Sequence, residues 1–325
     1  MKAVIVDAQR FRNHDFVYEK NLFEKNEFEF EIKSCTNEEE VIEQCYDADV
    51  IMDVYTKIGA KAINAFTNCK AMIRYGIGFD VFNIEAATRR GIMVCNVPDY
   101  CISEVASHAA TMILACARQL LYHTIHVRNG VWKSIPPYPK RRLSNQVLGL
   151  VGFGNIARQT AAYLKAFGFK MIAYDPFVLE KKFAELGVKS VSMEELCRES
   201  DYISIHIPLN EQTFHLINEE KIQTMKDGVV IVNTSRGAII CEEALIKALQ
   251  SGKIGAVGLD VFENEPFEWK DHPFFNMNNV LLTPHVAYES AEASQVLRQR
   301  VAETALKVLM GGVPDFVVNR RELGL

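Results

Sequence analysis

Short apolar runs, rich in β-branched residues, alternate with amphipathic stretches along the first hundred positions of the chain. Runs of this length are typical of buried strands, and they cover residues 3–6, 49–54, 71–74 and 92–95. The stretches between them repeat their apolar residues at helical spacing, and they cover 37–45, 57–66 and 84–90. This alternation predicts a parallel sheet with helices on both faces.

A second alternation begins at Val147, after a helical stretch over 103–122 and a strandless segment over 125–145. The strands expected there cover 147–151, 171–174, 202–207, 229–233, 256–260 and 280–282. A capping box begins at Ser192, and Gly168 and Gly252 stand where helices should end. The last amphipathic stretch covers 291–309. The pattern therefore predicts two α/β halves.

Composition narrows the class of protein. A length of 325 residues suits two domains, and 49% hydrophobic and 24% charged residues are ordinary globular values. The net charge of −5, without a dense basic run, argues against a nucleic-acid partner. No apolar run approaches the ~20 residues of a membrane span, and the run at 3–6 is too short for a signal peptide.

The eight cysteines are scattered and form no C-x-x-C motif. His123 and His126 form one H-x-x-H, but no cysteine or carboxylate stands close by to complete a metal site. We therefore expect reduced thiols, a cytoplasmic protein and no metal site.

A glycine-rich turn stands between the expected strand 147–151 and the helical stretch that follows it. The sequence GFGNIA at 152–157 matches G-x-G-x-x-A in the required setting of strand, tight turn and helix. Gly152 permits the turn, and Gly154 lets a pyrophosphate approach the backbone. The N–H groups of Asn155 and Ile156 and the helix dipole attract its phosphates. This motif predicts dinucleotide binding.

An acidic residue follows the next expected strand. Asp175 lies 21 residues after Gly154 (175 minus 154), where a carboxylate receives the ribose hydroxyls. A carboxylate at this place repels a 2′-phosphate, and no arginine occupies 176–180. We therefore expect NAD rather than NADP.

Three chemically distinct side chains follow three successive expected strands. Arg236 follows the strand at 229–233, Glu265 follows the strand at 256–260, and His285 follows the strand at 280–282. Ligands bind outside the carboxyl ends of strands in open α/β sheets. We therefore expect these three side chains to converge where the nicotinamide lies.

Their chemistry fits the reduction of a 2-keto acid. Arg236 can hold the carboxylate of the acid with its planar fork, and His285 can give a proton to the carbonyl oxygen. Glu265 would orient the imidazole and favour its charged form. NADH supplies the hydride. Taken singly, each residue could be an ordinary surface or turn residue; together, beside a nucleotide site, they predict an oxidoreductase.

Four motifs, GLVGFGNIAR, NTSRGAII, GLDVFENEP and LLTPHVA, occur in this order and spacing. Over nearly its whole length the chain resembles the D-isomer-specific 2-hydroxyacid dehydrogenases. The resemblance implies that Arg236, Glu265 and His285 are catalytic. It implies further cofactor contacts by Val105, His206, Ile207, Pro208, Thr234, Ser235 and Asp260, and substrate contacts by the N–H groups of Ile77 and Gly78 and by Tyr100.

The resemblance also implies the domain arrangement. A Rossmann cofactor domain over 102–284 would be inserted into a flavodoxin-like substrate domain over 1–101 and 285–325. Both would be α/β domains with doubly wound parallel sheets. The segment over 125–145, which carries Trp132 and Tyr138, resembles the arm that packs on a partner in this family, so a homodimer is expected.

Within the family, RYGIGFD, CNVPDY and VPDFVVN are most similar to the C-terminal-binding-protein branch and its bacterial enzyme relatives. Phosphoglycerate dehydrogenases are also similar, but they usually carry an arginine-serine pair where this chain has Tyr55, Thr56 and Lys57. The expected function is therefore an NAD-dependent oxidoreductase acting on a small D-2-hydroxy or 2-keto acid. The alternatives are an NAD-sensing corepressor-like scaffold and a phosphoglycerate dehydrogenase proper.

Overall fold

The computed structural model describes residues 1–10, 15–133, 135–136, 138–267 and 270–325. The chain divides into two compact units. Unit 1 consists of Met1–Tyr100 with Ser290–Leu325, and unit 2 consists of Cys101–Glu289. Within the described residues, none of the helices has the length and apolar character needed to cross a membrane.

Unit 1 is built on a five-stranded parallel sheet in the order β2-β1-β3-β4-β5. This is the flavodoxin-like strand order. The strands are β1 (Lys2–Ile5), β2 (Glu29–Ile32), β3 (Val50–Asp53), β4 (Ala71–Arg74) and β5 (Met93–Cys95). Its helices are α1 (Val17–Lys25), α2 (Glu38–Cys45), α3 (Ala60–Ala65), α4 (Ile84–Arg89) and α12 (Ala291–Leu309).

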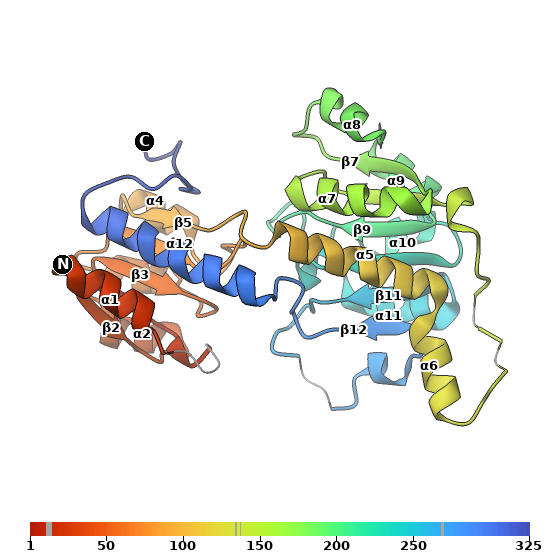
Figure 1. Ribbon diagram of the computed structural model, residues 1–325, viewed down its shortest axis with the longest axis horizontal. Coiled ribbons are helices and arrows are strands. Elements are labelled where there is room, and N and C mark those ends of the chain that lie inside the picture. Colours follow the sequence, from red (N-terminus) through yellow and green to blue (C-terminus); the bar gives the residue numbers. More distant parts are fainter. Residues whose placement is uncertain (11–14, 134, 137, 268–269) are drawn as a thin grey trace. The chain divides into compact units, whose positions relative to one another are not determined.

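The two faces of the unit 1 sheet pack against different helices. Alternate strand residues, such as Ala3 and Ile5, share a buried cluster with Leu297 and Val301 of α12, which lies beside α1 (Figure 1). The intervening strand residues join a second cluster with α2, α3 and α4. The C-terminal helix therefore belongs to the core of unit 1 although it is last in the sequence.

Unit 2 is built on a seven-stranded parallel sheet in the order β12-β11-β10-β9-β6-β7-β8. This order is Rossmann-like, with one strand added at the β12 edge. The strands are β6 (Val147–Val151), β7 (Lys170–Tyr174), β8 (Lys189–Ser190), β9 (Tyr202–Ile205), β10 (Val229–Asn233), β11 (Ile254–Leu259) and β12 (Val280–Leu282). The helices are α5 (Ile102–Arg118), α6 (Leu120–Arg128), α7 (Asn155–Leu164), α8 (Glu180–Leu186), α9 (Met193–Glu199), α10 (Glu219–Thr224) and α11 (Glu242–Ser251).

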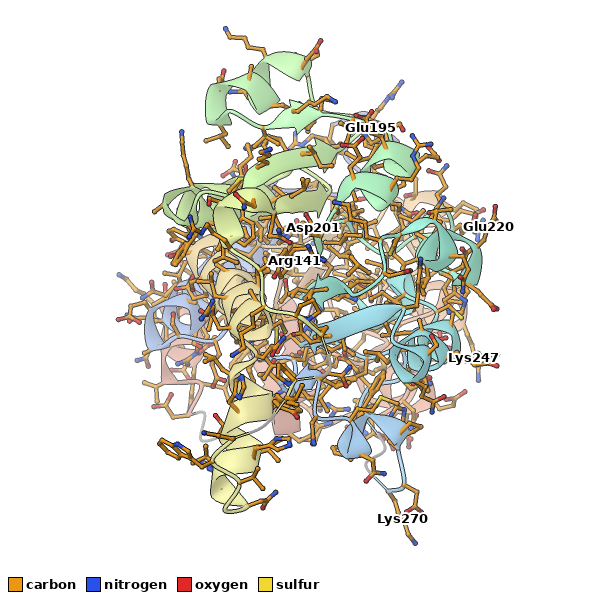
Figure 2. All side chains as sticks on the ribbon, turned by 90° about the vertical axis from the view of Figure 1, so that its right-hand side faces the viewer. Arg141, Glu195, Asp201, Glu220, Lys247 and Lys270 are labelled. Carbon is orange, nitrogen blue, oxygen red and sulfur yellow. The ribbon has the colours of Figure 1, made fainter. Side chains whose placement is uncertain are left out.

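Helices cover both faces of the unit 2 sheet. Helices α5 and α7 lie side by side over one face (Figure 1), and α9, α10 and α11 contribute to the apolar cluster on the other. On the side seen in Figure 2, Glu195, Glu220 and Lys247 stand on the outer helices. Asp201 anchors the sheet there, because its carboxylate accepts a hydrogen bond from the N–H of Val147 at 2.8 Å. The doubly wound α/β architecture predicted for both halves is confirmed.

Several elements differ from the sequence prediction, among them the two-residue strand β8, which was not expected. Strand β2 and helix α1 were not expected, because the short β2 has a half-exposed pattern without a buried run. The prediction of a single helix over 103–122 is wrong. The chain turns at Gln119, whose φ of 56° is left-handed, and α6 starts at the next residue. The Gln119 side chain is held there by a hydrogen bond, since its Nε2 donates to the carbonyl of Tyr138 at 2.7 Å.

Candidate active site

The first turn of the unit 2 sheet depends on Gly152, which directly follows β6. Its φ is 90°, and an added Cβ would lie 2.6 Å from the carbonyl oxygen of His206 and 2.8 Å from Cγ2 of Ile207. A left-handed backbone and the close passage of a second loop both require glycine. The turn leads directly into α7, which begins at Asn155.

The backbone at the start of α7 faces open space. Gly154 has a φ of −69°, and a Cβ added there would meet no heavy atom within 4 Å beyond its chain neighbours. No described residue accepts a hydrogen bond from the N–H of Asn155 or Ile156. Arg158 steadies this turn by donating to the carbonyl of Phe153 at 2.8 Å. Open backbone and the positive end of a helix dipole suit a dinucleotide diphosphate.

Asp175 directly follows β7 and lies beside the glycine-rich turn. Its Oδ2 accepts a hydrogen bond from the N–H of Phe153 at 2.8 Å, and its Oδ1 accepts one from the N–H of Phe177 at 2.9 Å. Each carboxylate oxygen has a second lone pair. The carboxylate is therefore held in place by the backbone while it keeps acceptor capacity for ribose hydroxyls.

The loop after β9 carries three of the expected cofactor contacts, His206, Ile207 and Pro208. His206 Nε2 lies 2.9 Å from the hydroxyl of Ser204, and burial lowers the pKa of His206 to about 4. The imidazole therefore remains neutral near pH 7. Val105, another expected contact, lies in the first turn of α5 and is almost fully buried.

The loop after β10 is shaped by the buried amide of Asn233. Its Nδ2 donates to the carbonyl of Arg236 at 2.8 Å, and its Oδ1 accepts from the N–H of Ser235 at 3.0 Å. The hydroxyl oxygen of Thr234 is buried and has no hydrogen-bond partner among the described residues. An orphaned buried hydroxyl costs free energy unless a ligand pairs with it. Thr234 therefore fits a cofactor contact, and the residues in this part of unit 2 fit NAD.

Glycine at position 237 sets the distance between two loops. A Cβ added to Gly237 would lie 1.8 Å from the carbonyl carbon of Phe262 and 2.4 Å from the nitrogen of Glu263. The backbone after Arg236 therefore packs directly against the backbone before Glu265. The motif NTSRG contains this glycine, but the sequence alone does not reveal the contact with Phe262 that requires it.

Glu265 and His285 are in direct contact. His285 Nδ1 lies 2.7 Å from Oε2 of Glu265, and both side chains are partly exposed. Oε1 of Glu265 accepts a hydrogen bond from the N–H of Phe262 at 2.9 Å. Burial raises the pKa of Glu265, but His285, Phe262 and the charge of Arg236 outweigh burial and hold that pKa below its ordinary value. Glu265 is therefore an ionised partner for the imidazole.

Asp260 holds the loop that carries His285. The Asp260 side chain is fully buried; its Oδ1 accepts from the N–H of Val286 and its Oδ2 from the N–H of Ala287, both at 2.9 Å. The Thr283 hydroxyl donates to the same carboxylate at 2.5 Å. These bonds fix His285 in a left-handed conformation with φ of 54°. The sequence did not predict this role of Asp260, since its bonds span more than twenty positions.

The expected substrate-contacting residues Ile77, Gly78 and Tyr100 lie in unit 1. The carbonyl of Ile77 accepts a hydrogen bond from Nδ2 of Asn96 at 2.7 Å, which fixes the loop after β4. Among the described residues, none accepts a hydrogen bond from the N–H of Ile77 or Gly78. These two N–H groups therefore suit a carboxylate. Tyr100 is partly buried and packs against the apolar core of unit 1.

Comparison with known proteins shows the family of this chain. Residues 110–287 match the model of the D-isomer specific 2-hydroxyacid dehydrogenase NAD-binding domain. The chain is 37% identical over 285 residues to a glyoxylate reductase of Korarchaeum cryptofilum, covering 86% of this chain and 85% of that protein. It is 42% identical over 255 residues to a hydroxypyruvate reductase of Thermotoga maritima, covering 78% and 82%.

A D-3-phosphoglycerate dehydrogenase of Methanocaldococcus jannaschii is 38% identical over 293 residues, but the chain spans only 55% of that protein. Among solved structures, a D-lactate dehydrogenase from Aquifex aeolicus, complexed with NAD and lactic acid, superposes with a TM-score of 0.87. It is 27% identical, and the match covers 98% of this chain and 99% of that one. The chain belongs to the D-isomer specific 2-hydroxyacid dehydrogenases, which are NAD-dependent oxidoreductases.

Proposed function

We propose that this enzyme reduces a short, unphosphorylated 2-keto acid to the D-2-hydroxy acid, with His285 as the proton donor. The observation that carries this proposal is the 2.7 Å contact between His285 Nδ1 and Glu265 Oε2. The contact leaves Nε2 of the imidazole as the nitrogen that can meet a substrate. Because an ionised carboxylate favours the protonated imidazole, Glu265 prepares His285 to act as a general acid.

Arg236 would hold the carboxylate of the substrate. Its guanidinium belongs to a loop fixed by Asn233 and can present paired N–H donors to a carboxylate. We propose that the N–H groups of Ile77 and Gly78 contribute to binding the same carboxylate, and that Tyr100 contacts the substrate. With the carboxylate held, the carbonyl oxygen can be oriented toward His285.

The cofactor would be held by unit 2. Gly152, Gly154, Asn155 and Ile156 would bind the diphosphate, and Asp175 would bind the ribose hydroxyls. The remaining cofactor contacts that we propose are made by Val105, His206, Ile207, Pro208, Thr234, Ser235 and Asp260. When bound, NADH supplies the hydride. In this assignment unit 2 is the cofactor domain and unit 1 the substrate domain.

The finer part of the proposal is that the substrate carries no phosphate group. The loop after β3 presents Tyr55 and Lys57 at the surface, where phosphoglycerate dehydrogenases usually have an arginine-serine pair. The backbone of this loop is fixed, because the Asp7 carboxylate accepts from the N–H groups of Val54 and Tyr55 at 3.0 and 2.7 Å. A rigid loop without the arginine supports a substrate that lacks phosphate.

NADH oxidation with a panel of acids tests this function. We expect the highest kcat/KM with glyoxylate, hydroxypyruvate or pyruvate, and a much lower value with phosphohydroxypyruvate. A preference for phosphohydroxypyruvate would contradict the assignment and favour a phosphoglycerate dehydrogenase. No reduction of any of these acids would contradict the reaction class.

We further propose a homodimer in the cytoplasm. Helix α6 buries none of its residues in the single chain. Leu120 and Val127 within it, and Trp132 and Ile135 after it, are more than half exposed. Exposed apolar side chains gathered on one segment support a protein contact. Tyr138 is not exposed in this way. It packs against the core of unit 2, and its hydroxyl donates to the carbonyl of Cys116 at 2.7 Å. Residues 134 and 137 of this segment lie outside the described residues.

Light scattering tests the assembly. We expect twice the chain mass at micromolar concentration for the wild type, and the mass of one chain for Trp132→Asp combined with Ile135→Asp. A wild-type protein with the mass of one chain would contradict the dimer.

The cysteines are all free and six of the eight are buried, which supports a reducing compartment.

A further inference from the structure

A second histidine–carboxylate pair lies outside the three proposed catalytic residues. His215 belongs to the segment between β9 and α10, and its Nε2 lies 2.8 Å from Oε1 of Glu263. Because an ionised carboxylate only accepts hydrogen bonds, Nε2 of His215 carries the proton in this contact. The two residues are 48 positions apart, so no local sequence pattern pairs them.

The backbone of His215 is held in an unfavourable conformation. Its φ is 49°, in the left-handed region that few residues other than glycine adopt. Its N–H donates to the carbonyl of Ala238 at 2.8 Å, and its ring stacks on Phe214 at a centroid distance of 3.9 Å. Such a conformation persists where the surrounding contacts determine it, and it is enriched at functional sites. His215 is therefore tied to the loop that follows Arg236.

Glu263 connects His215 to two further segments. Its Oε2 accepts a hydrogen bond from the N–H of Glu242 at 3.1 Å, at the start of α11. The residue before α11, Cys241, provides no side-chain cap, so Glu263 caps this helix from another loop. Both oxygens of Glu263 are used, and its position is fixed from two directions.

The backbone of Phe262 leads from this pair to Glu265. The N–H of Phe262 donates to Oε1 of Glu265 at 2.9 Å, and Glu265 in turn contacts His285 at 2.7 Å. The carbonyl of Phe262, in the following peptide with Glu263, packs against Gly237, where no Cβ would fit. A shift of Glu263 therefore moves the N–H group that orients the carboxylate of Glu265.

We propose that His215 and Glu263 are positioning residues for Glu265, and that they act through the backbone of Phe262. This inference rests on the proposed roles of Glu265 and His285. Neither His215 nor Glu263 is assigned to substrate or cofactor. Their contact keeps the Phe262 N–H aimed at Glu265, so that the carboxylate stays in contact with the imidazole.

A neighbouring pair provides a matched control. His272 Nε2 lies 3.1 Å from Oε1 of Glu242, and both side chains are about as buried as those of His215 and Glu263. His272 also accepts a hydrogen bond from the N–H of Phe274. This pair joins α11 to the segment before β12 without a bond to Phe262 or Glu265. Its loss should affect stability but leave the orientation of Glu265 unchanged.

The test compares His215→Phe, His215→Gln and His272→Phe in the full-length enzyme. We expect His215→Phe to lower kcat for keto-acid reduction by ~10- to 100-fold, the size of effect that a small misplacement of a reacting group produces. The pH above which its kcat declines, here called the pH limit, should move to lower pH. The same direction is expected for Glu265→Gln, because loss of a nearby negative charge disfavours the protonated imidazole of His285. His215→Gln places an Nε2 donor at a similar reach and should recover most of kcat. NADH affinity should change little in all three variants.

A double variant separates positioning from a general structural effect. In the double variant, His215→Phe should shift the pH limit no further than Glu265→Gln alone. The reason is that residue 265, which His215 positions, no longer carries a charge. His272→Phe should keep the wild-type profile even if its melting temperature falls. If His215→Phe matches His272→Phe in kcat and pH limit, or if His215→Gln fails as completely as His215→Phe, the proposal is overturned. If Glu265→Gln alone has a wild-type profile, the proposed catalytic function fails instead.

Discussion

Gly237 and Phe262 are in backbone contact so close that a single added carbon would lie 1.8 Å from the carbonyl carbon of Phe262. The contact joins the loop of Arg236 to the loop of Glu265. It sets the separation between the loop of Arg236 and the carboxylate of Glu265, which contacts His285. The site therefore depends on a residue that has no side chain.

Gly237→Ala should separate these two loops. Overpacking of this kind typically costs about 1–3 kcal/mol of stability, and displacement of reacting groups costs ~100-fold in rate. We expect kcat/KM for keto-acid reduction to fall by about that factor, while NADH still binds to the glycine-rich turn. Thermal unfolding and a fluorescence titration with NADH check the two effects. Unchanged activity in a stable Gly237→Ala protein would show that the loops do not need this contact.

Gly154→Ala should weaken NADH binding with little effect on stability, the opposite of Gly237→Ala. The added Cβ meets no heavy atom within 4 Å beyond its chain neighbours, so the melting temperature of the cofactor-free protein should fall far less than in Gly237→Ala. NADH should bind at least tenfold more weakly, since about 1.4 kcal/mol lost in a crowded diphosphate contact has that effect. The comparison with Gly237→Ala distinguishes a glycine needed by the ligand from one needed by the fold. Normal NADH affinity in Gly154→Ala would remove this residue from the diphosphate site.

Asp175 should decide between the two nicotinamide cofactors. Its carboxylate lies beside the glycine-rich turn and would repel a 2′-phosphate. Asp175→Asn removes the charge but keeps an oxygen that can accept from the N–H of Phe153, so it tests charge without losing the turn. We expect the wild type to prefer NADH strongly, and Asp175→Asn to narrow that preference by tenfold or more. Steady-state kinetics with NADH and NADPH measure the ratio. Equal use of both cofactors by the wild type would contradict this role.

Much of the fold was predictable because buried parallel strands have uninterrupted apolar runs. Strands such as β6 and β10 begin and end where the hydrophobic pattern places them. Strand β2 was missed because it lies at the sheet edge, where polar residues alternate with apolar ones. The break at Gln119 was missed because a left-handed backbone at a glutamine depends on a tertiary contact, here with Tyr138.

The convergence of Arg236, Glu265 and His285 was predictable from one rule, that carboxyl ends of parallel strands share an edge. The strands that precede them, β10, β11 and β12, are neighbours in the sheet. The supporting contacts were not predictable from the sequence. Those of His215 with Glu263 and of Asp260 with Ala287 join residues 48 and 27 positions apart, and such pairs follow from loop conformations rather than from spacing.

We propose that His285 gives the proton to the keto acid, and that the carboxylate of Glu265 favours the protonated imidazole. The pH dependence of kcat for keto-acid reduction, measured for wild type and Glu265→Gln, tests it most directly. Reduction needs the protonated imidazole, so activity is present at low pH and declines as the imidazole loses its proton. His206 cannot cause this decline, because burial lowers its pKa to about 4. His285→Ala serves as the reference without a donor, and it should lose ~100- to 10,000-fold in kcat.

Removing the opposite charge disfavours the protonated imidazole. The account therefore predicts that the decline in Glu265→Gln begins at lower pH than in wild type, with NADH affinity unchanged. Coincident profiles for the two proteins, or near wild-type reduction by His285→Ala, would contradict it.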